Sequence, residues 1–323
     1  MNVLISSAGR RVALLRLFRR TLADLGLTGR VLAADMSALS AAFHEADEGF
    51  VVPRCTSEEF VPEMLELCRR HRVGLVIPTI DPELAVYAAH RDEFAEIGTT
   101  VAVSTPEVVA IGGDKQATHQ WLTANGLPAV AQGSVEEARS WPLPVVVKPR
   151  FGSASIGLSV VRTDAQWAAV GDEEMIVQKM APGVEHTLDV LADRDGRCCC
   201  VVPRRRLEVR AGEVSKAVTV RSQPLIDLGR ALCEALPGAY GALNVQVFVA
   251  GDEVRVIELN ARFGGGFPLA WEAGAPFPRW IIEELLGEPV SGDPAGWRDG
   301  LVMLRYDDAV FRQAPHVGLA PGR

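Results

Sequence analysis

The sequence predicts a parallel α/β domain followed by an α+β unit, and three observations carry that prediction. Over the first hundred residues, short apolar runs alternate with amphipathic segments, which is typical of a parallel sheet covered by helices. After about residue 105, strands that can pair as hairpins predominate. The chain has 323 residues, which is long for one hydrophobic core and favours two or three packed subdomains.

The elements of the N-terminal domain follow from the spacing of apolar residues. Strands are expected at 2–6, 31–34, 49–52, 74–78 and 100–103, with helices at 10–25, 58–71 and 82–91. Ligands of parallel sheets gather at the carboxyl ends of the strands, where Asp35 and the segment 79–83 fall. Asp81 and Glu83 are more typical of acids that stabilise a helix start, with a substrate role as the alternative.

The second half begins with a predicted helix at 114–125 and a strand at 145–148, and strands then continue to about residue 259. A helix is expected at 280–286, before an irregular tail rich in proline and glycine. A domain boundary is therefore expected near residue 105, with an α+β unit behind it.

Composition excludes several classes of protein. Hydrophobic residues make up 48% of the chain, which argues against disorder, and the net charge of −8 argues against a nucleic-acid-binding surface. No apolar run reaches 18 residues, so no membrane span is expected, and the opening residues do not resemble a signal peptide. Six cysteines without a CxxC pair predict neither a zinc site nor disulfides, which favours a cytoplasmic protein.

A hairpin of alternating residues is the most specific feature. In the segments 241–249 and 254–260, a three-residue turn would place Gln246 opposite Glu258 and Asn244 opposite Asn260. Oxygen-bearing side chains with one carboxylate among them suit Mg²⁺ that is also held by phosphate oxygens. A solvent-exposed polar face is an equally good interpretation of this hairpin taken alone.

Two further segments have the chemistry of a nucleotide site. The stretch KPRFGSASIGL at 148–158 joins a strand-end lysine to a loop of glycine and serine, which can offer N–H groups to phosphate. The stretch IVQKMAPGVE at 176–185 can offer backbone groups and Met180 to a flat base, and Glu185 to ribose. Each of them alone is more typical of an ordinary loop or turn.

In this order, the three elements resemble the ATP-grasp superfamily, and most of all its stand-alone carbamoyl-phosphate-synthase-like ligases. The resemblance runs from SSAGRR at 6–11, through VPRRRLEVRAGEVSK at 202–216 and IELNARFGGG at 257–266, to about residue 287. It implies a pre-ATP-grasp domain at 1–105, an ATP-grasp small subdomain at 106–180 and a C-terminal subdomain at 181–323 that holds the metal site.

The resemblance also implies roles for individual residues. Phosphate contacts are implied for Lys115, Lys148 and the loop residues Gly152, Ser153, Ser155 and Gly157. The adenine hinge is Gln178, Lys179 and Met180, and the ribose ligand is Glu185. Lys216 reaches the transferred phosphate, Gln246, Glu258 and Asn260 hold the metal, and Arg262 with Gly264 and Gly265 orients the acyl substrate.

Two positions depart from the family pattern. Gln178 stands where many relatives have glutamate, and Gln246 stands where a carboxylate is usual. The site then carries less negative charge, so metal affinity is expected to depend more on ATP itself. The chain is also far shorter than carbamoyl-phosphate synthase, which contains two such units.

The function implied is an ATP-dependent carboxylate–amine ligase that uses ATP and Mg²⁺, with Mn²⁺ as a substitute. It would form an amide through an acyl phosphate and release ADP and phosphate. The expected partners are small carboxylate and amine substrates resembling amino acids, and a second copy of the chain in a homodimer. The alternatives are carboxyphosphate chemistry on bicarbonate and a nucleotide-binding module without turnover.

Other sequence features favour simpler interpretations. Gly9 with Asp35 hints at a dinucleotide site, but one glycine stands where three are needed. Arg10 and Arg11 are more typical of surface charge at a helix start than of a contact to a substrate carboxylate. His186 is best interpreted as structural, and the run Arg204–Arg206 as either a solvated strand or an anion contact.

Overall fold

The computed structural model describes residues 1–152, 156–171, 174–210 and 212–313. Its first layer is a parallel sheet in the order β3-β2-β1-β4-β5. These strands are β1 (Asn2–Ile5), β2 (Val31–Asp35), β3 (Glu48–Val51), β4 (Val73–Ile77) and β5 (Thr100–Val101). The helices around this sheet are α1 (Val12–Asp24), α2 (Ala41–Glu45), α3 (Phe60–His71), α4 (Asp81–Ala89) and α5 (Arg91–Glu96). The predicted parallel α/β architecture is confirmed.

Alternate residues of the central strand pack on opposite faces of this sheet. Val3 and Ile5 belong to the same apolar cluster as Phe18 of α1, whereas Leu4 packs in the cluster that contains Phe60 of α3. Both faces are therefore covered, which explains why these strands are continuous apolar runs.

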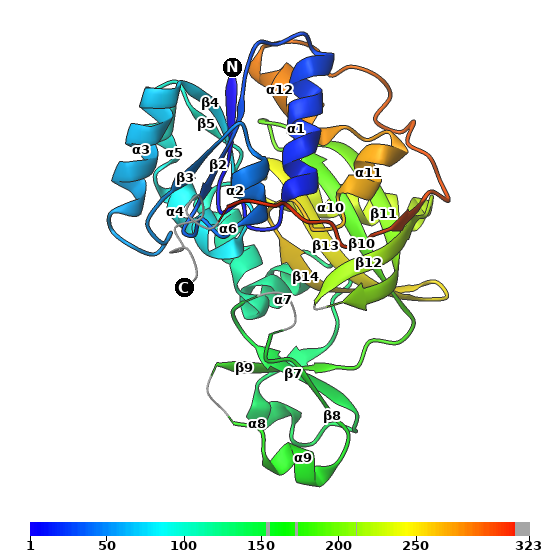
Figure 1. The fold of residues 1–323 in the computed structure, drawn as a ribbon. Helices are drawn as coiled ribbons and strands as arrows, with labels where there is room; N and C mark the ends of the chain where they lie inside the picture. Colours follow the sequence, from blue (N-terminus) through cyan, green and yellow to red (C-terminus); the bar gives the residue numbers. More distant parts are fainter. Residues whose placement is uncertain (153–155, 172–173, 211, 314–323) are drawn as a thin grey trace.

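A small lobe follows and forms the lower part of the molecule in Figure 1. Its antiparallel sheet has the order β6-β9-β7-β8. The strands are β6 (Gln132–Gly133), β7 (Val145–Pro149), β8 (Ser159–Val161) and β9 (Met175–Lys179), with helices α8 (Val135–Ala138) and α9 (Asp164–Ala168). Helices α6 (Pro106–Gly113) and α7 (Lys115–Ala124) connect this lobe to the first layer.

The third layer is an antiparallel sheet in the order β14-β13-β10-β11-β12-β15, called the large sheet below. Its strands are β10 (Val184–Ala192), β11 (Cys198–Arg210), β12 (Glu213–Thr219), β13 (Gly241–Ala250), β14 (Glu253–Asn260) and β15 (Val302–Leu304). Its helices are α10 (Gln223–Ala235), α11 (Pro268–Ala273) and α12 (Phe277–Leu285). Strand β15 lies in the tail that was expected to be irregular, and α10 interrupts the predicted run of strands.

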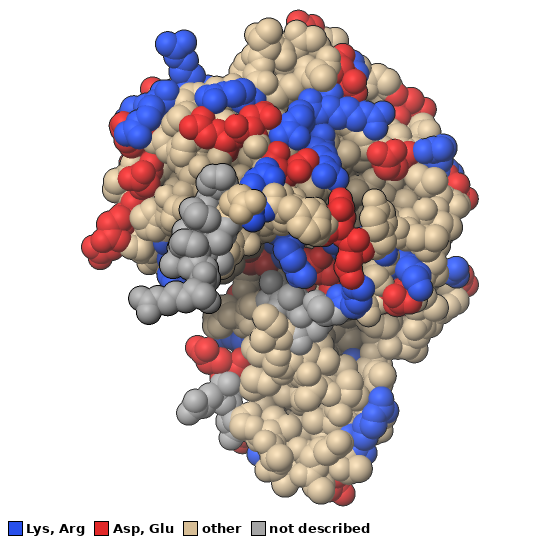
Figure 2. All heavy atoms as spheres, in the orientation of Figure 1, with Lys and Arg blue, Asp and Glu red and all other residues tan. Residues whose placement is uncertain are grey.

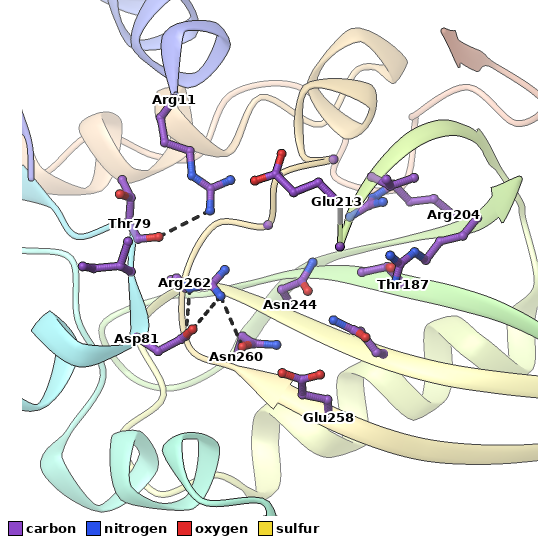
Figure 3. A pocket seen from close by; sticks show the side chains of 18 of the residues that line it. Arg11, Thr79, Asp81, Thr187, Arg204, Glu213, Asn244, Glu258, Asn260 and Arg262 are labelled. Carbon is purple, nitrogen blue, oxygen red and sulfur yellow. Dashed lines mark hydrogen bonds and ion pairs between the residues drawn. The ribbon is translucent and has the colours of Figure 1, made fainter. Parts of the chain in front are cut away.

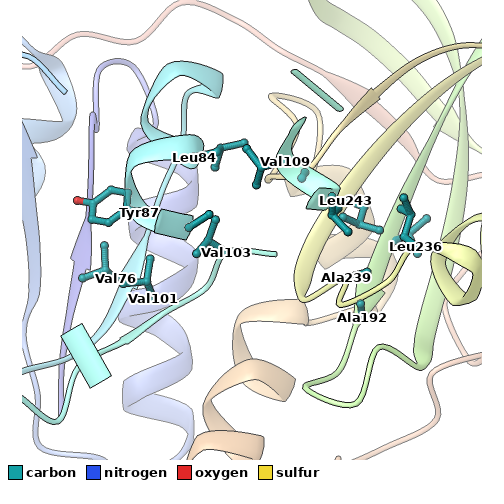
Figure 4. Packing of buried hydrophobic residues seen from close by; sticks show 14 of the residues in the cluster. Val76, Leu84, Tyr87, Val101, Val103, Val109, Ala192, Leu236, Ala239 and Leu243 are labelled. Carbon is teal, nitrogen blue, oxygen red and sulfur yellow. The ribbon is translucent and has the colours of Figure 1, made fainter. Parts of the chain in front are cut away.

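The first sheet and the large sheet share one continuous apolar core. Figure 4 shows Tyr87 and Val103 on one side of this core and Leu243 on the other, with Val109 of α6 between them. The small lobe has a separate core built around Val147, Trp167 and Val177. On the face seen in Figure 2, few charged side chains are visible on this lobe, while acidic and basic side chains intermingle over the larger body.

Candidate active site

One face of the large sheet carries a row of polar side chains from neighbouring strands. The strand register pairs Glu258 with Gln246, Gln246 with Thr187, and Thr187 with Arg204. Directly paired residues of antiparallel strands point to the same face, so these four side chains stand side by side. The adjacent row consists of Asn260, Asn244 and Asp189.

The predicted pairing of the hairpin is confirmed, but the predicted three-residue turn is wrong. Val249 pairs with Val254 and Ala250 with Glu253, which leaves a turn of two residues. A β-bulge at Ile257 adds one residue to β14 and restores the register at Glu258. The bulge also turns the Ile257 carbonyl toward the small lobe, where it accepts a hydrogen bond from Lys148 Nζ at 3.4 Å.

A cavity of about 240 Å³ lies between this sheet face and the N-terminal domain (Figure 3). Helix α4 and the segment before it supply Thr79 and Asp81, and the N-terminus of α1 supplies Arg11. The predicted site residues that line the cavity are Gln246, Glu258, Asn260, Arg262, Gly264 and Gly265.

Arg262 crosses the centre of the cavity and joins the two domains. Its Nε and Nη2 atoms donate to the two carboxylate oxygens of Asp81, each at 2.8 Å, and Nη2 also donates to Asn260 Oδ1 at 3.3 Å. Both ends of this ion pair are largely buried. Asp81 therefore holds the guanidinium beside Asn260, one of the predicted metal ligands, which is a more specific role than that of a helix-start acid.

Three consecutive glycines allow side chains to approach the backbone after β14. A Cβ atom on Gly264 would lie 2.3 Å from Asn244 Nδ2, and one on Gly266 would lie 2.4 Å from Arg204 Nη1. Arg204 is only 1% exposed, and its Nε donates to Asp189 Oδ2 at 2.5 Å. The alternative of a solvated strand is thus wrong for this arginine, because its charge is buried and paired.

Two of the predicted phosphate ligands are buried lysines on the small-lobe side. Lys115 is 9% exposed and Lys148 is 6% exposed, and Lys115 Nζ donates to the Gly152 carbonyl at 2.5 Å. Burial lowers the pKa of Lys148 to about 8, although the nearby Glu258 carboxylate opposes this shift. Burial also lowers the pKa of Lys115. The charged form of a buried ammonium group is stabilised when a phosphate group binds beside it.

The loop between β7 and β8 supplies glycines with unusual backbone angles. Gly152 has a φ of 92° and Gly157 a φ of 74°, and a Cβ on Gly157 would lie 2.8 Å from Pro149 Cγ. Both positions therefore favour glycine. The predicted ligands Ser153 and Ser155 lie outside the described residues.

The residues of the predicted adenine hinge lie at the end of β9. Gln178 is buried, and its Nε2 donates to Gln132 Oε1 at 2.8 Å. The Lys179 ammonium lies 5.5 Å from the centre of the Trp141 ring, and Met180 is half exposed. Glu185 is the second residue of β10, the next strand along the chain, and is ion-paired with Arg206. None of these four hinge and ribose residues lines the cavity.

Lys216 does not lie where a residue that reaches the transferred phosphate was expected. The strand register pairs Ala217, not Lys216, with Arg206, and it pairs Lys216 with Glu208. The Lys216 ammonium is about half exposed and donates to Glu208 Oε2 at 2.7 Å. Lys216 does not line the cavity, whereas Arg204 and Arg206 of strand β11 do.

Sequence reasoning favoured surface charge for Arg11, with a substrate contact only as the alternative, and it proposed no role for Glu213 or Asp189. Figure 3 shows Arg11 and Glu213 pointing toward one another at the end of the cavity away from Glu258. Nothing in their local sequence distinguishes them from surface charges. Asp35, in contrast, accepts hydrogen bonds from the backbone N–H groups of Gly9 and Ser37, at 2.7 and 3.0 Å. Each of its oxygens thus accepts a hydrogen bond from the backbone of its own domain.

Family models match both halves of this arrangement. The PylC-like N-terminal domain matches residues 3–102, and the ATP-grasp domain matches residues 112–266. The chain belongs to the ATP-grasp superfamily. The second match contains the paired hairpin, the buried lysines and the glycines that follow β14.

Curated relatives of this ATP-grasp chain include large-chain synthases and ligases. It is 28% identical over 254 residues to the carbamoyl phosphate synthase large chain of Rubrobacter xylanophilus, covering 70% of this chain and 23% of that protein. It is 33% identical over 116 residues to the D-alanine–D-alanine ligase of Chromohalobacter salexigens, covering 32% and 35%. The chain thus spans only about a quarter to a third of the length of these relatives.

Solved structures share the ATP-grasp fold over nearly the whole chain. One is the biotin carboxylase domain dimer of Hydrogenobacter thermophilus 2-oxoglutarate carboxylase, crystallised with MgADP, ADP and bicarbonate. It has a TM-score of 0.71 at 19% identity and covers 93% of this chain and 73% of that one. In the described part of the present chain, no helix is both long and apolar enough to cross a bilayer.

Proposed function

We propose that the chain is an ATP-dependent carboxylate–amine ligase that acts on small, amino-acid-like substrates. The observation that carries the proposal is the pairing of Gln246 with Glu258 and of Asn244 with Asn260 on one wall of a cavity, beside the buried ammonium of Lys148. The ATP-grasp match over residues 112–266 supports ATP as the phosphoryl donor.

The residues of the proposed metal site fit Mg²⁺ or Mn²⁺ only when a nucleotide is present. Among the described residues, no group of three or more histidine, cysteine, aspartate or glutamate side chains is placed to hold a metal. Glu258 would supply one carboxylate, and Asn260 and Gln246 one amide oxygen each. This donor set suits a hard cation whose remaining ligands are phosphate oxygens and water. The bound ion would neutralise charge on the β- and γ-phosphates.

The other residues of the site would position the reactants rather than form covalent bonds. Lys115, Lys148 and the loop after β7 would hold the phosphates, and Arg262, fixed by Asp81, would orient the substrate carboxylate. That carboxylate would accept the γ-phosphoryl group to give an acyl phosphate and ADP, and an amine would then displace phosphate. Such transfer depends on positioning and electrostatic stabilisation, so no protein nucleophile is required.

Bicarbonate is the second candidate for the activated acid. A structural neighbour of 19% identity was crystallised with bicarbonate, and a carbamoyl phosphate synthase is among the curated relatives. The cavity of about 240 Å³ is larger than bicarbonate requires, and this favours an organic acid. A cytoplasmic location and a homodimer complete the proposal. Free thiols at all six cysteines support the first, and the dimeric neighbour supports the second.

Release of ADP in the presence of Mg²⁺ tests this function, with pools of amino acids and other acids, with amines, and with bicarbonate. The proposal predicts ADP release that requires both an acid and an amine. Release that depends on bicarbonate alone would support carboxyphosphate chemistry. Tight ATP binding without ADP release under any condition would contradict both and favour a binding module without turnover.

Glu258→Ala should abolish this ADP release while leaving the fold intact, because it removes the only carboxylate proposed to hold the metal. Glu253→Ala is the matched control, since Glu253 lies on the same hairpin, is exposed and pairs with Arg255. Circular dichroism should show that both variants are folded. Undiminished turnover in Glu258→Ala would contradict the proposed metal site.

A further inference from the structure

The end of the cavity beneath helix α1 contains a cation that the proposed reaction does not use. Arg11 projects into the cavity, and in the described part of the chain its guanidinium makes one long hydrogen bond, from Nη2 to the Thr79 carbonyl at 3.4 Å. Burial and the positive charge of Arg262 lower the pKa of Arg11 to about 10. A largely desolvated guanidinium with unused N–H donors is unfavourable unless an anion accepts hydrogen bonds from them and balances the charge.

The charge around Arg11 remains positive when its neighbours are included. Glu213 faces it, but Glu213 also lies 3.1 Å from Arg305 Nη1 and 3.6 Å from Arg10 Nη2. One carboxylate thus stands among three arginines. Burial raises the pKa of Glu213, but Arg11 and Arg305 outweigh that effect and leave it lowered, so Glu213 is ionised and still outnumbered. The nearby Asp81 and Arg262 neutralise each other.

Arg11 and Glu213 both lie close to Gly265, which lines the same cavity. A Cβ atom on Gly265 would lie 3.2 Å from Arg11 Nη1 and 3.4 Å from the Glu213 carboxyl carbon. The point above this glycine is therefore within contact distance of both side chains. On the far side of the same glycine run, Arg204 Nη1 is buried without a hydrogen-bond partner in the described part of the chain. Two guanidinium groups with unused donors thus line one cavity.

We propose that the space bounded by Arg11, Glu213 and Gly265 binds a second anionic group of the substrate, distinct from the carboxylate that is activated. The inference rests on the proposed function, which places the reacting carboxylate beside Arg262 in the centre of the cavity. The ligand group is an oxyanion, either a carboxylate or a phosphate monoester, since a guanidinium binds both through paired hydrogen bonds. The acid substrate is accordingly a dicarboxylate or a phosphorylated carboxylate.

Equilibrium binding of simple anions tests the site without requiring the true substrate. The protein is saturated with Mg²⁺ and a non-hydrolysable ATP analogue, which fills the nucleotide site, and succinate or inorganic phosphate is then titrated by calorimetry. Arg11→Gln should weaken binding of the preferred anion at least tenfold, and Arg11→Lys should weaken it less. Arg20→Gln, on the same helix but outside the cavity, should change it less than twofold. Equal affinity in wild type and Arg11→Gln would overturn the proposal.

Turnover supplies the second readout and separates the two proposals. Acids with a second carboxylate or a phosphate should support ADP release better than acetate or propionate, and Arg11→Gln should raise their KM at least tenfold with kcat changed less than threefold. Efficient turnover of an acid without a second anion would overturn the inference alone. Anion binding that depends on Arg11, without ADP release from any acid, would instead contradict the proposed ligase.

Discussion

We expect Lys148 to make nucleotide binding sensitive to pH, because burial lowers its pKa to about 8. Below pH 8 the ammonium is charged and attracts phosphate, whereas above pH 8 the free protein loses this charge. Binding must then take up a proton, so affinity for the Mg²⁺ complex of an ATP analogue should fall progressively as the pH rises past 8.

Calorimetric titrations between about pH 6.5 and pH 9.5 would measure this dependence, and the heat in buffers of different ionisation enthalpy would report the proton. Lys148→Arg is the control, because a guanidinium keeps its charge over this range and should flatten the profile. An affinity that is independent of pH in wild type would show that Lys148 does not contact the nucleotide.

The sequence carries unequal information about individual site residues. The pairing of Gln246 with Glu258 was predicted from a three-residue turn, whereas the observed two-residue turn gives the same pairing only because of the bulge at Ile257. The role of Arg11 was not predictable, since an arginine at a helix start has the same local pattern whether it faces water or a cavity. For Lys216, the sequence could not reveal that Glu208 holds the ammonium.

At the scale of elements, the glycine run after β14 sets how closely the loop approaches the large sheet. A Cβ on Gly266 would lie 2.4 Å from Arg204 Nη1 and 2.7 Å from Val214 Cγ1. Gly266→Ala would therefore displace the buried Arg204 from Asp189, and we expect it to lower the free energy of unfolding by about 1–3 kcal/mol.

Urea unfolding followed by tryptophan fluorescence would measure this loss. Gly113→Ala is the control, because a Cβ on Gly113 meets no atom within 4 Å, and it should change stability by less than about 0.5 kcal/mol. If both variants unfold at the same urea concentration, the close approach at Gly266 does not constrain the fold.

Periodicity predicted the long elements better than the short ones and the bulges. Helix α7 lies within one residue of its predicted bounds, and its start is marked by Asp114, whose side chain accepts a hydrogen bond from the Gln116 N–H. Strand β15 has three residues, too few to show a period, and it forms only because the edge of β12 is available for pairing. The bulge at Ile257 depends on pairing across two strands, which the sequence of one strand does not encode.

At the scale of the whole molecule, the small lobe is the part best able to respond to nucleotide. It has a separate apolar core, whereas the first sheet and the large sheet share one. Its polar links to the rest include Lys148 to the Ile257 carbonyl and Arg150 to Asp114, and these lie beside the proposed phosphate site. Nucleotide binding should therefore stabilise this lobe relative to the body.

Hydrogen–deuterium exchange would test this expectation. The Mg²⁺ complex of a non-hydrolysable ATP analogue should slow exchange in strands β7 and β9 at least severalfold, while exchange in β1 and β4 stays unchanged. The Glu258→Ala variant serves as the control, because weaker metal binding should reduce the protection. Uniform protection of all layers would contradict an independent small lobe.

A crystal structure with Mg²⁺ and a non-hydrolysable ATP analogue is the most direct measurement of the central claim, that the two hairpin strands and the buried lysines form one phosphate and metal site. We predict a Mg²⁺ ion bound at about 2.1 Å by oxygens of Glu258 and Asn260 and by phosphate, with Lys115 and Lys148 on the triphosphate. A nucleotide bound elsewhere, or a metal ion that Glu258 does not contact, would contradict this account.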